Sequence, residues 1–446
     1  MSYDFTTAAN SLDEFWMPFT PMRLFKKSPR MVVRADGMYY YDQNGKEIID
    51  AIAGLWCVNA GHNNPQVKDA IKTQLDTLDY VSQFQYGNPT AHRAASRLVA
   101  AMPEPFTNVF FSSSGSEAVE TALKIAIAYH RANKEGTRRL LIGRERAYHG
   151  VNFGGISVGG ISSNRTAYGQ LLPSVAHLPH THNLKQNAFK RGMPDWGAHL
   201  ADELERLVYL HDPSNIAAVI VEPVAGATGV LPPPQGYMQR LREICTKYGI
   251  LMIFDEVITG FGRFGDISSA DYFGVMPDII TLAKGMTNGT IPMGATFVTE
   301  KIYETFMNGP EHAIELMHGY TYSGHPMAAA AAIGTLDAMR DQQIWDNAKK
   351  MEKPFEDAVH SLKGKPRVID IRTCGILAAI QLEDYSKEDP AKYSRDASWK
   401  LFERGAMVRY GGAGSNLFLC PPLIFNQNHL DRMVTQVGEV LDEMAA

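Results

Sequence analysis

The chain has 446 residues, 45% of them hydrophobic, and a formal net charge of −5, a composition typical of a globular enzyme. This mild acidity argues against nucleic acid or an anionic membrane as the main partner, and no apolar run approaches the roughly 18–20 residues of a membrane span. The four cysteines are scattered without a CxxC pair, and the first 16 residues lack the basic region and apolar core of a signal peptide. We therefore expect reduced thiols and a cytoplasmic protein.

The N-terminal quarter predicts few regular elements. Residues 1–30 are irregular and aromatic, and we expect them to wrap a surface. Residues 31–53 contain two β-like runs around Asn44-Gly45, a dipeptide that favours a tight hairpin. A helical pattern follows at 65–78.

From residue 109 onward, patterns typical of strands and helices alternate. Strands are expected at 109–111, 140–143, 217–223, 250–254 and 279–282, and helices at 116–130 and 235–248. A glycine- and serine-rich segment at 150–163 is expected to be a loop. This alternation predicts an α/β fold with a mainly parallel sheet and helices on both faces.

The composition also suggests how the chain divides. A helix of small residues at 326–340 can pack closely against its neighbours, and the pattern after about residue 345 is that of a separate α+β lobe. We expect an N-terminal segment (1–55) that joins the small domain, a large domain (56–325) and a C-terminal small domain (326–446).

Asp255 and Lys284 are the two polar residues around which the candidate site is organised. Each follows a short apolar run of the length of a buried parallel strand. Ligands of open α/β sheets bind at the carboxyl ends of the strands, so both side chains are expected at one edge. Two other interpretations remain open: Lys284 as an ordinary surface lysine, and Asp255 as the structural partner of an arginine such as Arg263.

A Ser/Gly-rich turn at 112–116 precedes the helix at 116–130. Free N–H groups and the positive end of the helix dipole make such a turn a seat for a phosphate group, although an ordinary capped helix would look the same. The Asp255-Glu256 pair after an apolar strand also resembles the acidic strand end of a nucleotide hydrolase. The chain, however, has no GxxxxGK[ST] phosphate loop.

Other candidates are weaker. Tyr148 and His149 lie in a glycine loop where an aromatic ring can stack on a planar cofactor. Arg409 follows an apolar pair and could clamp a carboxylate, or simply be solvated. Trp56 and Phe84 are either core aromatics or pocket walls. His177, His180 and His182 resemble a zinc cluster but lack a nearby cysteine or carboxylate, so we expect a polar loop and no metal.

Taken together, the motifs resemble a known family. FFSSSGSEAVE, AYHG, VEP, IFDEVITGFGR, PDIITLAKGMTNG and GYTYSGHP resemble the class III (ω-) aminotransferases, which are fold type I enzymes dependent on pyridoxal 5′-phosphate (PLP). GLWCVNAGH, LDYVSQFQYGNP, HLPHT, RGMP, HDPSNIAAVIVEP and VRYGG resemble the branch acting on β-alanine or another ω-amino acid and pyruvate. The resemblance covers nearly the whole chain and implies a seven-stranded-type sheet in the large domain.

The resemblance implies a role for each candidate around the cofactor. Lys284 would form the aldimine link to PLP, and Asp255 would bond the pyridine nitrogen. Tyr148 would stack on one face of the ring and Val257 would cover the other. The remaining cofactor-binding candidates are Ser114, Gly115 and Ser116 at the phosphate, His149 and Glu222 near the ring, and Thr321 reaching the phosphate of a partner subunit.

The substrate side is implied in the same way. Arg409 resembles the arginine that pairs with a substrate carboxylate and swings aside for neutral substrates, while Trp56, and Phe84 from the partner chain, would shape the pocket. Where the branch pattern continues GGDT, this chain has the less acidic run 411–415 (GGAGS). Because this loop differs from the family pattern, the resemblance implies the geometry of Arg409 less directly than the positions of the other candidates.

The function implied is a ping-pong amino transfer from a small amine donor to an oxo-acid acceptor such as pyruvate, in a homodimer or possibly a tetramer. Asp255 would keep the ring nitrogen protonated and Lys284 would carry the proton. Three alternatives stay open: an aminomutase or decarboxylase of the same fold, a nucleotide hydrolase, and a non-catalytic cofactor-binding or scaffold protein.

Overall fold

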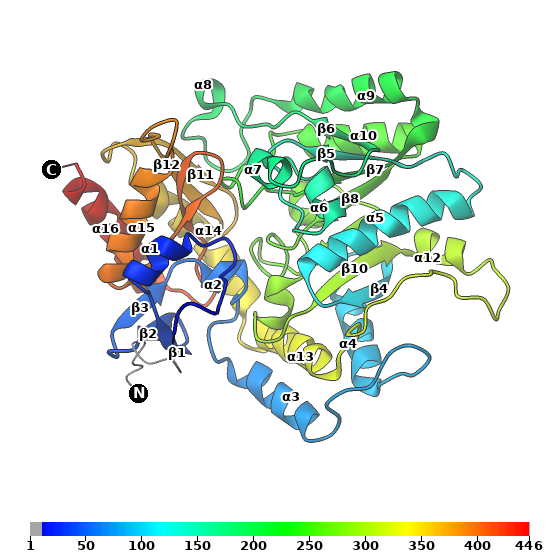
Figure 1. Cartoon of the computed structure of the whole chain (residues 1–446), viewed down its shortest axis with the longest axis horizontal. Coiled ribbons are helices and arrows are strands. Elements are labelled where there is room, and N and C mark those ends of the chain that lie inside the picture. Colours follow the sequence, from blue (N-terminus) through cyan, green and yellow to red (C-terminus); the bar gives the residue numbers. More distant parts are fainter. Residues whose placement is uncertain (1–10, 446) are drawn as a thin grey trace.

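A seven-stranded sheet forms the centre of the molecule (Figure 1), whose computed structural model describes residues 11–445. Its strand order is β4-β10-β9-β8-β7-β5-β6. Only β10 runs antiparallel to its neighbours β4 and β9. The strands, in chain order, are β4 (Phe106–Ser112), β5 (Leu140–Arg144), β6 (Val175–Leu178), β7 (Ile216–Val221), β8 (Leu251–Asp255), β9 (Ile279–Leu282) and β10 (Gly294–Thr299).

The register of the central strands positions the two key residues. Every residue of β7, β8 and β9 is buried, as expected for parallel strands covered on both faces. Asp255, the last residue of β8, pairs with Thr281 of β9. Lys284 follows only three residues later, so both side chains emerge at the same edge of the sheet.

Helices cover both faces of this sheet. The helical face predicted from the sequence, Val119, Ala122, Leu123 and Ala126 of α5, is buried. The helices of this lobe are α3 (Pro65–Leu75), α4 (Pro89–Ala101), α5 (Gly115–Ala132), α6 (Phe153–Val158), α7 (Ser162–Thr166), α8 (Leu184–Asn187), α9 (Glu203–His211), α10 (Tyr237–Tyr248), α11 (Ala270–Phe273), α12 (Glu300–Phe306) and α13 (Pro326–Asp341). Short 3₁₀ helices lie at η2 (Ala198–Asp202), η3 (Pro213–Asn215) and η4 (Lys284–Thr287).

Two four-stranded sheets form the smaller lobe, drawn in blue and orange in Figure 1. One has the order β11-β12-β15-β14 and is antiparallel throughout; the other, β1-β2-β3-β13, joins N-terminal strands to a late one. The elements are α1 (Met22–Lys27), β1 (Val32–Asp36), β2 (Tyr39–Asp42), β3 (Glu47–Asp50), α2 (Ala53–Trp56), α14 (Ile344–His360), β11 (Val368–Thr373), β12 (Ala378–Leu382), α15 (Lys392–Glu403), β13 (Ala406–Met407), β14 (Arg409–Gly411), β15 (Ser415–Leu419) and α16 (Gln427–Glu443).

Some local predictions are confirmed and others are wrong. The hairpin predicted around Asn44-Gly45 joins β2 to β3, and the Asn44 N–H donates to the Asp42 carboxylate at 2.8 Å. The segment 150–163, predicted as a loop, contains α6. The helix packs so closely on its neighbours that it needs glycine at positions 154 and 155: a Cβ on Gly155 would lie 2.3 Å from the His149 carbonyl oxygen. Tertiary packing thus overrides the low helix propensity of glycine.

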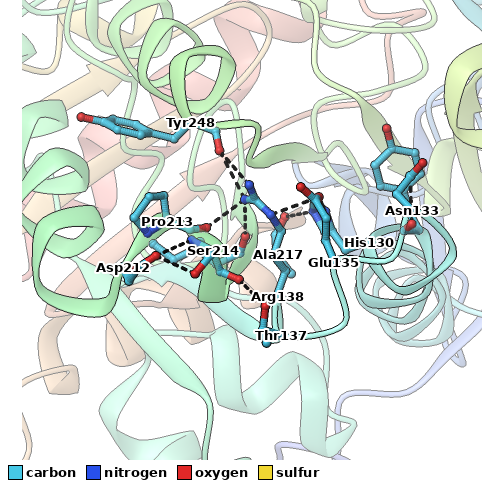
Figure 2. A network of polar contacts seen from close by, with 12 residues as sticks. His130, Asn133, Glu135, Thr137, Arg138, Asp212, Pro213, Ser214, Ala217 and Tyr248 are labelled. Carbon is cyan, nitrogen blue, oxygen red and sulfur yellow. Dashed lines mark hydrogen bonds and ion pairs between the residues drawn. The ribbon is translucent and has the colours of Figure 1, made fainter.

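A polar network around Arg138 (Figure 2) holds together the end of the large sheet that lies opposite Asp255. The Arg138 guanidinium donates to the carbonyl oxygens of Pro213, Ile216 and Tyr248 at 2.9–3.2 Å, which ties the start of β7 to the end of α10. These contacts lie at the amino ends of the strands, opposite Asp255. Within residues 11–445 no helix is long and apolar enough to cross a bilayer.

Candidate active site

A pocket of about 290 Å³ lies at the carboxyl edge of β8 and β9. Its walls come from five parts of the large lobe, namely the turn before α5, the loop after β5, the end of β7, the loop after β8 and the loop after β9, together with Cys57 at the end of α2. The lining residues are Cys57, Ser113, Ser114, Gly115, Ser116, Tyr148, His149, Gly150, Glu222, Asp255, Val257, Ile258, Ala283, Lys284, Thr287, Gly289, Ile291, Pro292 and Met293. All of the predicted cofactor-binding residues except Thr321 therefore meet in one cavity.

Asp255 is held by three donors and is only 5% exposed. His149 Nδ1 lies 2.8 Å from Oδ2, while the Val257 N–H and the Thr281 hydroxyl donate to Oδ1 at 3.1 and 3.2 Å. These three contacts fix the orientation of the carboxylate, which lines the pocket. The alternative pairing of Asp255 with Arg263 is wrong, because Arg263 donates to the Pro421 carbonyl and to Asn59 Oδ1 instead.

Lys284 begins the 3₁₀ helix η4 directly after β9 and has a φ of 46°, a region that only a few per cent of non-glycine residues adopt. Such strain persists where the surroundings impose it, often at functional sites. Burial lowers the pKa of the Lys284 ammonium, although the nearby Cys57, Asp255 and Glu222 oppose this shift. Lys284 is therefore a pocket-lining lysine with a lowered pKa, not an ordinary surface lysine.

The turn before α5 has the features of a phosphate seat. Ser114 is the N-cap of the helix, and its hydroxyl accepts from the Glu117 N–H at 3.2 Å. The N–H groups of Gly115 and Ser116 lie in the first turn, where no carbonyl of the helix can accept them. A Cβ on Gly115 would lie 2.9 Å from Val257 Cγ1, so glycine leaves the backbone open toward the pocket.

Glu222 follows β7 and carries the most perturbed carboxyl group of the pocket. The Tyr148 N–H donates to Oε1 at 3.0 Å and the Gly226 N–H to Oε2 at 3.1 Å. Burial raises the pKa of Glu222 from 4.5 to about 7, and the neighbouring Asp255 adds to the shift. The Tyr148 ring lines the same pocket, and burial raises the pKa of its hydroxyl.

The predicted substrate residues fall into two groups. Arg409 and Trp56 are together, with the guanidinium carbon 5.5 Å from the ring centre, beside a second cavity of about 580 Å³. Phe84 and Thr321 lie outside both cavities: Phe84 is 54% exposed, and the Tyr80 hydroxyl donates to the Thr321 carbonyl at 2.9 Å. A single chain thus brings Arg409 to a cavity wall, with the buried Trp56 ring against its guanidinium, whereas neither Phe84 nor Thr321 lines either cavity.

Two further sequence patterns have structural explanations. Glu256 is buried and accepts hydrogen bonds from Ser268, Ser269 and Thr259, away from the pocket, which gives no support to a nucleotide hydrolase. His177 Nε2 lies 3.0 Å from the Gly159 carbonyl. Across residues 11–445 no group of three His, Cys, Asp or Glu side chains is arranged to hold a metal ion.

The sequence pattern missed several wall residues. Cys57, Thr287 and the segment 289–293 line the pocket, yet only their neighbourhood to Trp56 and Lys284 could have indicated them. The contact between His149 and Asp255 was equally hidden, since 106 residues separate the two in sequence.

Comparisons with known proteins agree with this geometry. The family described as aminotransferase class-III matches residues 24–441. An omega-aminotransferase of Caulobacter vibrioides is 52% identical over 98% of this chain and 99% of its own length, and a beta-alanine–pyruvate aminotransferase of Pseudomonas aeruginosa is 46% identical over 98% and 97%. A solved amine transaminase from an uncultivated Pseudomonas species, in its PLP-bound form, superposes with a TM-score of 0.89 at 36% identity, covering 98% of this chain and 100% of that one. The chain therefore belongs to the class-III aminotransferases, the fold type I transaminases that depend on pyridoxal 5′-phosphate.

Proposed function

We propose that this enzyme transfers the amino group of an ω-amino acid or a simple amine, with β-alanine as the reference donor, to pyruvate. The observation that carries this proposal is the meeting of Lys284, Asp255 and the turn before α5 in one pocket. The names of the relatives at 46% and 45% identity, which specify β-alanine or an ω-amino acid together with pyruvate, support the choice of substrates.

The pocket fits PLP by the chemistry of its donors. We assign the phosphate to Ser114, Gly115 and Ser116, since unpaired N–H groups at a helix start favour an anion. Asp255 would hold the ring nitrogen in its protonated form, with His149 orienting the carboxylate. We place Tyr148 and Val257 at the two faces of the ring, and Glu222 beside its edge. When bound, the cofactor supplies an electron sink for the carbon that loses a proton.

Lys284 is assigned two tasks in this mechanism. It would hold the cofactor covalently, and its released neutral amine would take a proton from the donor carbon and return it to the cofactor. Both tasks require an uncharged nitrogen, which agrees with the lowered pKa.

Arg409 is assigned to the substrate carboxylate. No carboxylate within residues 11–445 forms an ion pair with it, and its guanidinium lies over the Trp56 ring, so it is free to meet an anion. A donor with an apolar tail would contact Trp56 once the arginine moves toward the adjacent cavity of about 580 Å³.

We further propose a homodimer in which Phe84 and Thr321 serve the partner's site. Exposed aromatic and apolar side chains surround both residues, a feature typical of interaction surfaces. They are Tyr80, Phe84, Tyr86, Ile314, Met317 and Tyr322. Tyr80 connects the two segments, because its ring contacts that of Tyr322 at 5.9 Å and its hydroxyl binds Thr321. Assembly of two such dimers into a tetramer is the second possibility.

We retain two further assignments as proposals. The division into 1–55, 56–325 and 326–446 is supported at its first boundary by the sheet β1-β2-β3-β13, which connects early strands to the late lobe; residues 1–10 lie outside the described residues. At the second boundary, α13, the first helix of the third part, packs against α3 of the large lobe. The scattered free cysteines support a cytoplasmic location.

One experiment tests the function. Purified protein incubated with PLP should be yellow, lose its visible band on addition of β-alanine, and form alanine when pyruvate follows. Colourless protein after incubation would refute the cofactor site. Bleaching without alanine formation would favour an aminomutase or a decarboxylase over the transaminase.

A further inference from the structure

Two rows of side chains cross the small sheet toward Arg409. In the antiparallel register, Asp370 of β11 pairs with Gln381 of β12, Gln381 with Asn416 of β15, and Asn416 with Gly411 of β14. Residues paired in this way project on one face. A polar row therefore runs across the whole sheet and ends in the hairpin that carries Arg409.

The second row lies two residues away on the same face. It runs from Arg372 through Ala379 and Phe418 to Arg409. Trp56 covers its end, with its ring 5.7 Å from that of Phe418. The two arginines thus stand at opposite ends of one row, the first buried and the second exposed.

Arg372 connects this sheet to the cofactor lobe. It is 6% exposed and pairs with Asp370, while Nη1 donates to Gln381 at 2.8 Å and Nη2 to Asn416 Oδ1 at 2.7 Å. Its Nε donates to the Gly229 carbonyl at 2.8 Å, in the loop whose other end is held by Glu222. One guanidinium therefore contacts both the loop beside the cofactor pocket and the base of the Arg409 hairpin.

Asn416, which Arg372 holds in place, in turn fixes the backbone of the hairpin. It is fully buried, and its Nδ2 donates to the carbonyl oxygens of Gly411 and Ala413, each at 3.1 Å. The Ala413 N–H in turn donates to the Thr228 carbonyl at 3.2 Å. The backbone that follows Arg409 is thereby fixed, whereas the Arg409 side chain itself is left without a polar partner in residues 11–445.

We propose that Asn416, oriented by Arg372, is a positioning residue that sets where Arg409 meets the substrate carboxylate and thereby determines the preference between carboxylate and neutral donors. This inference rests on the proposed function. Asn416 touches neither substrate nor cofactor; it acts by holding the Gly411 and Ala413 carbonyls.

The test compares Asn416→Ser with a matched control, Asn347→Ser. Asn347 also bridges two backbone carbonyls of the small lobe, those of Leu423 and Phe425 at 2.6 and 3.0 Å, but has no contact with the hairpin. In the PLP-loaded enzyme, Asn416→Ser should lower kcat/KM for β-alanine about tenfold, the effect of losing two ordinary hydrogen bonds, and change that for 1-phenylethylamine by less than about twofold. Asn347→Ser should leave the ratio of the two donors unchanged.

A second measurement separates this inference from the function itself. Propionate has a carboxylate but no amino, keto or aldehyde group, so calorimetry on the loaded enzyme reports carboxylate binding without turnover. We expect Asn416→Ser to weaken propionate binding about tenfold while the visible spectrum stays that of the wild type. Equal losses for both donors, or unchanged propionate binding, would overturn the positioning role yet leave transamination intact. If Asn416→Ser fails to fold, Asn416→Asp, which keeps the acceptor for Arg372 but not the two donors, carries the same test.

Discussion

His149 Nδ1 lies 2.8 Å from Asp255 Oδ2, in a contact that closes the loop after β5 onto the end of β8. Both side chains are buried, and the second ring nitrogen of His149 has no hydrogen-bond partner among the described residues. The pair leaves Asp255 with its orientation set by the protein before any ligand enters. A site pre-organised in this way loses little free energy to reorganisation during reaction.

Replacing His149 should therefore weaken catalysis less than replacing Asp255. We expect His149→Asn to lower kcat about tenfold, since two other donors still hold the carboxylate, and Asp255→Asn to lower it by about 10³-fold. Both variants should shift the pH dependence of the visible band. His130→Asn, a change at a buried histidine outside the pocket, is the control and should leave that band in place. Equal losses for His149→Asn and Asp255→Asn would contradict the supporting role.

Lys284→Ala should abolish covalent attachment of the cofactor. Borohydride reduction of the wild type followed by mass spectrometry should show the cofactor on the peptide containing Lys284, and the variant should show none. Activity should fall by about 10³-fold or more, because a positioned acid–base group alone contributes about 10²–10⁴-fold. The exposed Lys301→Ala provides the control. Cofactor still attached to the Lys284→Ala chain would refute the assignment.

The pH dependence of attachment follows from the lowered pKa of Lys284. Only the neutral amine attacks the cofactor, so the rate should rise with pH as the ammonium loses its proton. Since burial lowers this pKa from 10.5, the rise should be complete at a lower pH than for a free lysine. Stopped-flow absorbance on cofactor-free protein measures this rate. A midpoint at or above that of free lysine would contradict a desolvated amine.

Glu222 should make folding stability depend on pH in the opposite sense to an ordinary ion-paired carboxylate. The folded chain keeps this proton up to about pH 7, whereas the unfolded chain releases it near 4.5, so folding takes up a proton in that window. The stabilisation due to Glu222 is therefore largest below 4.5 and is lost as the pH rises through about 7. The Tm of the wild type minus that of Glu222→Gln, both without cofactor, should become more negative as the pH rises over this range. A difference that is flat or increases with pH would be the contrary result.

Arg409→Ala should separate the two donor classes. We expect kcat/KM for β-alanine to fall by about 10²-fold, the scale of losing a charge-assisted hydrogen-bonded pair, with little change for 1-phenylethylamine. Arg409→Lys should restore only part of the loss, because an ammonium does not reproduce the fork of the guanidinium. Comparable losses for both donors would remove the clamp from the mechanism.

The sequence predicted secondary structure well where hydrophobic patterning alone determines it. The strand β9 was predicted with its observed bounds, and β7 and β8 within two residues, because short apolar runs with both faces covered have few alternatives. The strand β10 was missed, since its GATFVT run has neither a continuous apolar stretch nor a two-residue alternation and directly continues the Thr/Gly-rich loop after Lys284. Its Thr296 side chain is satisfied only by the Ala118 carbonyl, a tertiary contact that no local pattern contains.

In the candidate site, too, some residues could be predicted from the sequence and others could not. Residues that act through their own chemistry, such as Lys284 and Asp255, stood out because they interrupt apolar runs. Residues that act through a neighbour did not: Asn416 and Arg372 look like ordinary polar residues of alternating strands until the register pairs them. Phe84 and Thr321 remain predictions, because a single chain does not carry the surface on which they would act.

The parallel pairing of β3 with β13 joins residues 47–50 to 406–407, so the first sheet of the small lobe cannot be completed until most of the chain has been made. During synthesis the large lobe can fold first, while the N-terminal strands wait with an open edge that only β13 covers. We therefore expect the nascent chain to be most prone to aggregate before its last 40 residues leave the ribosome.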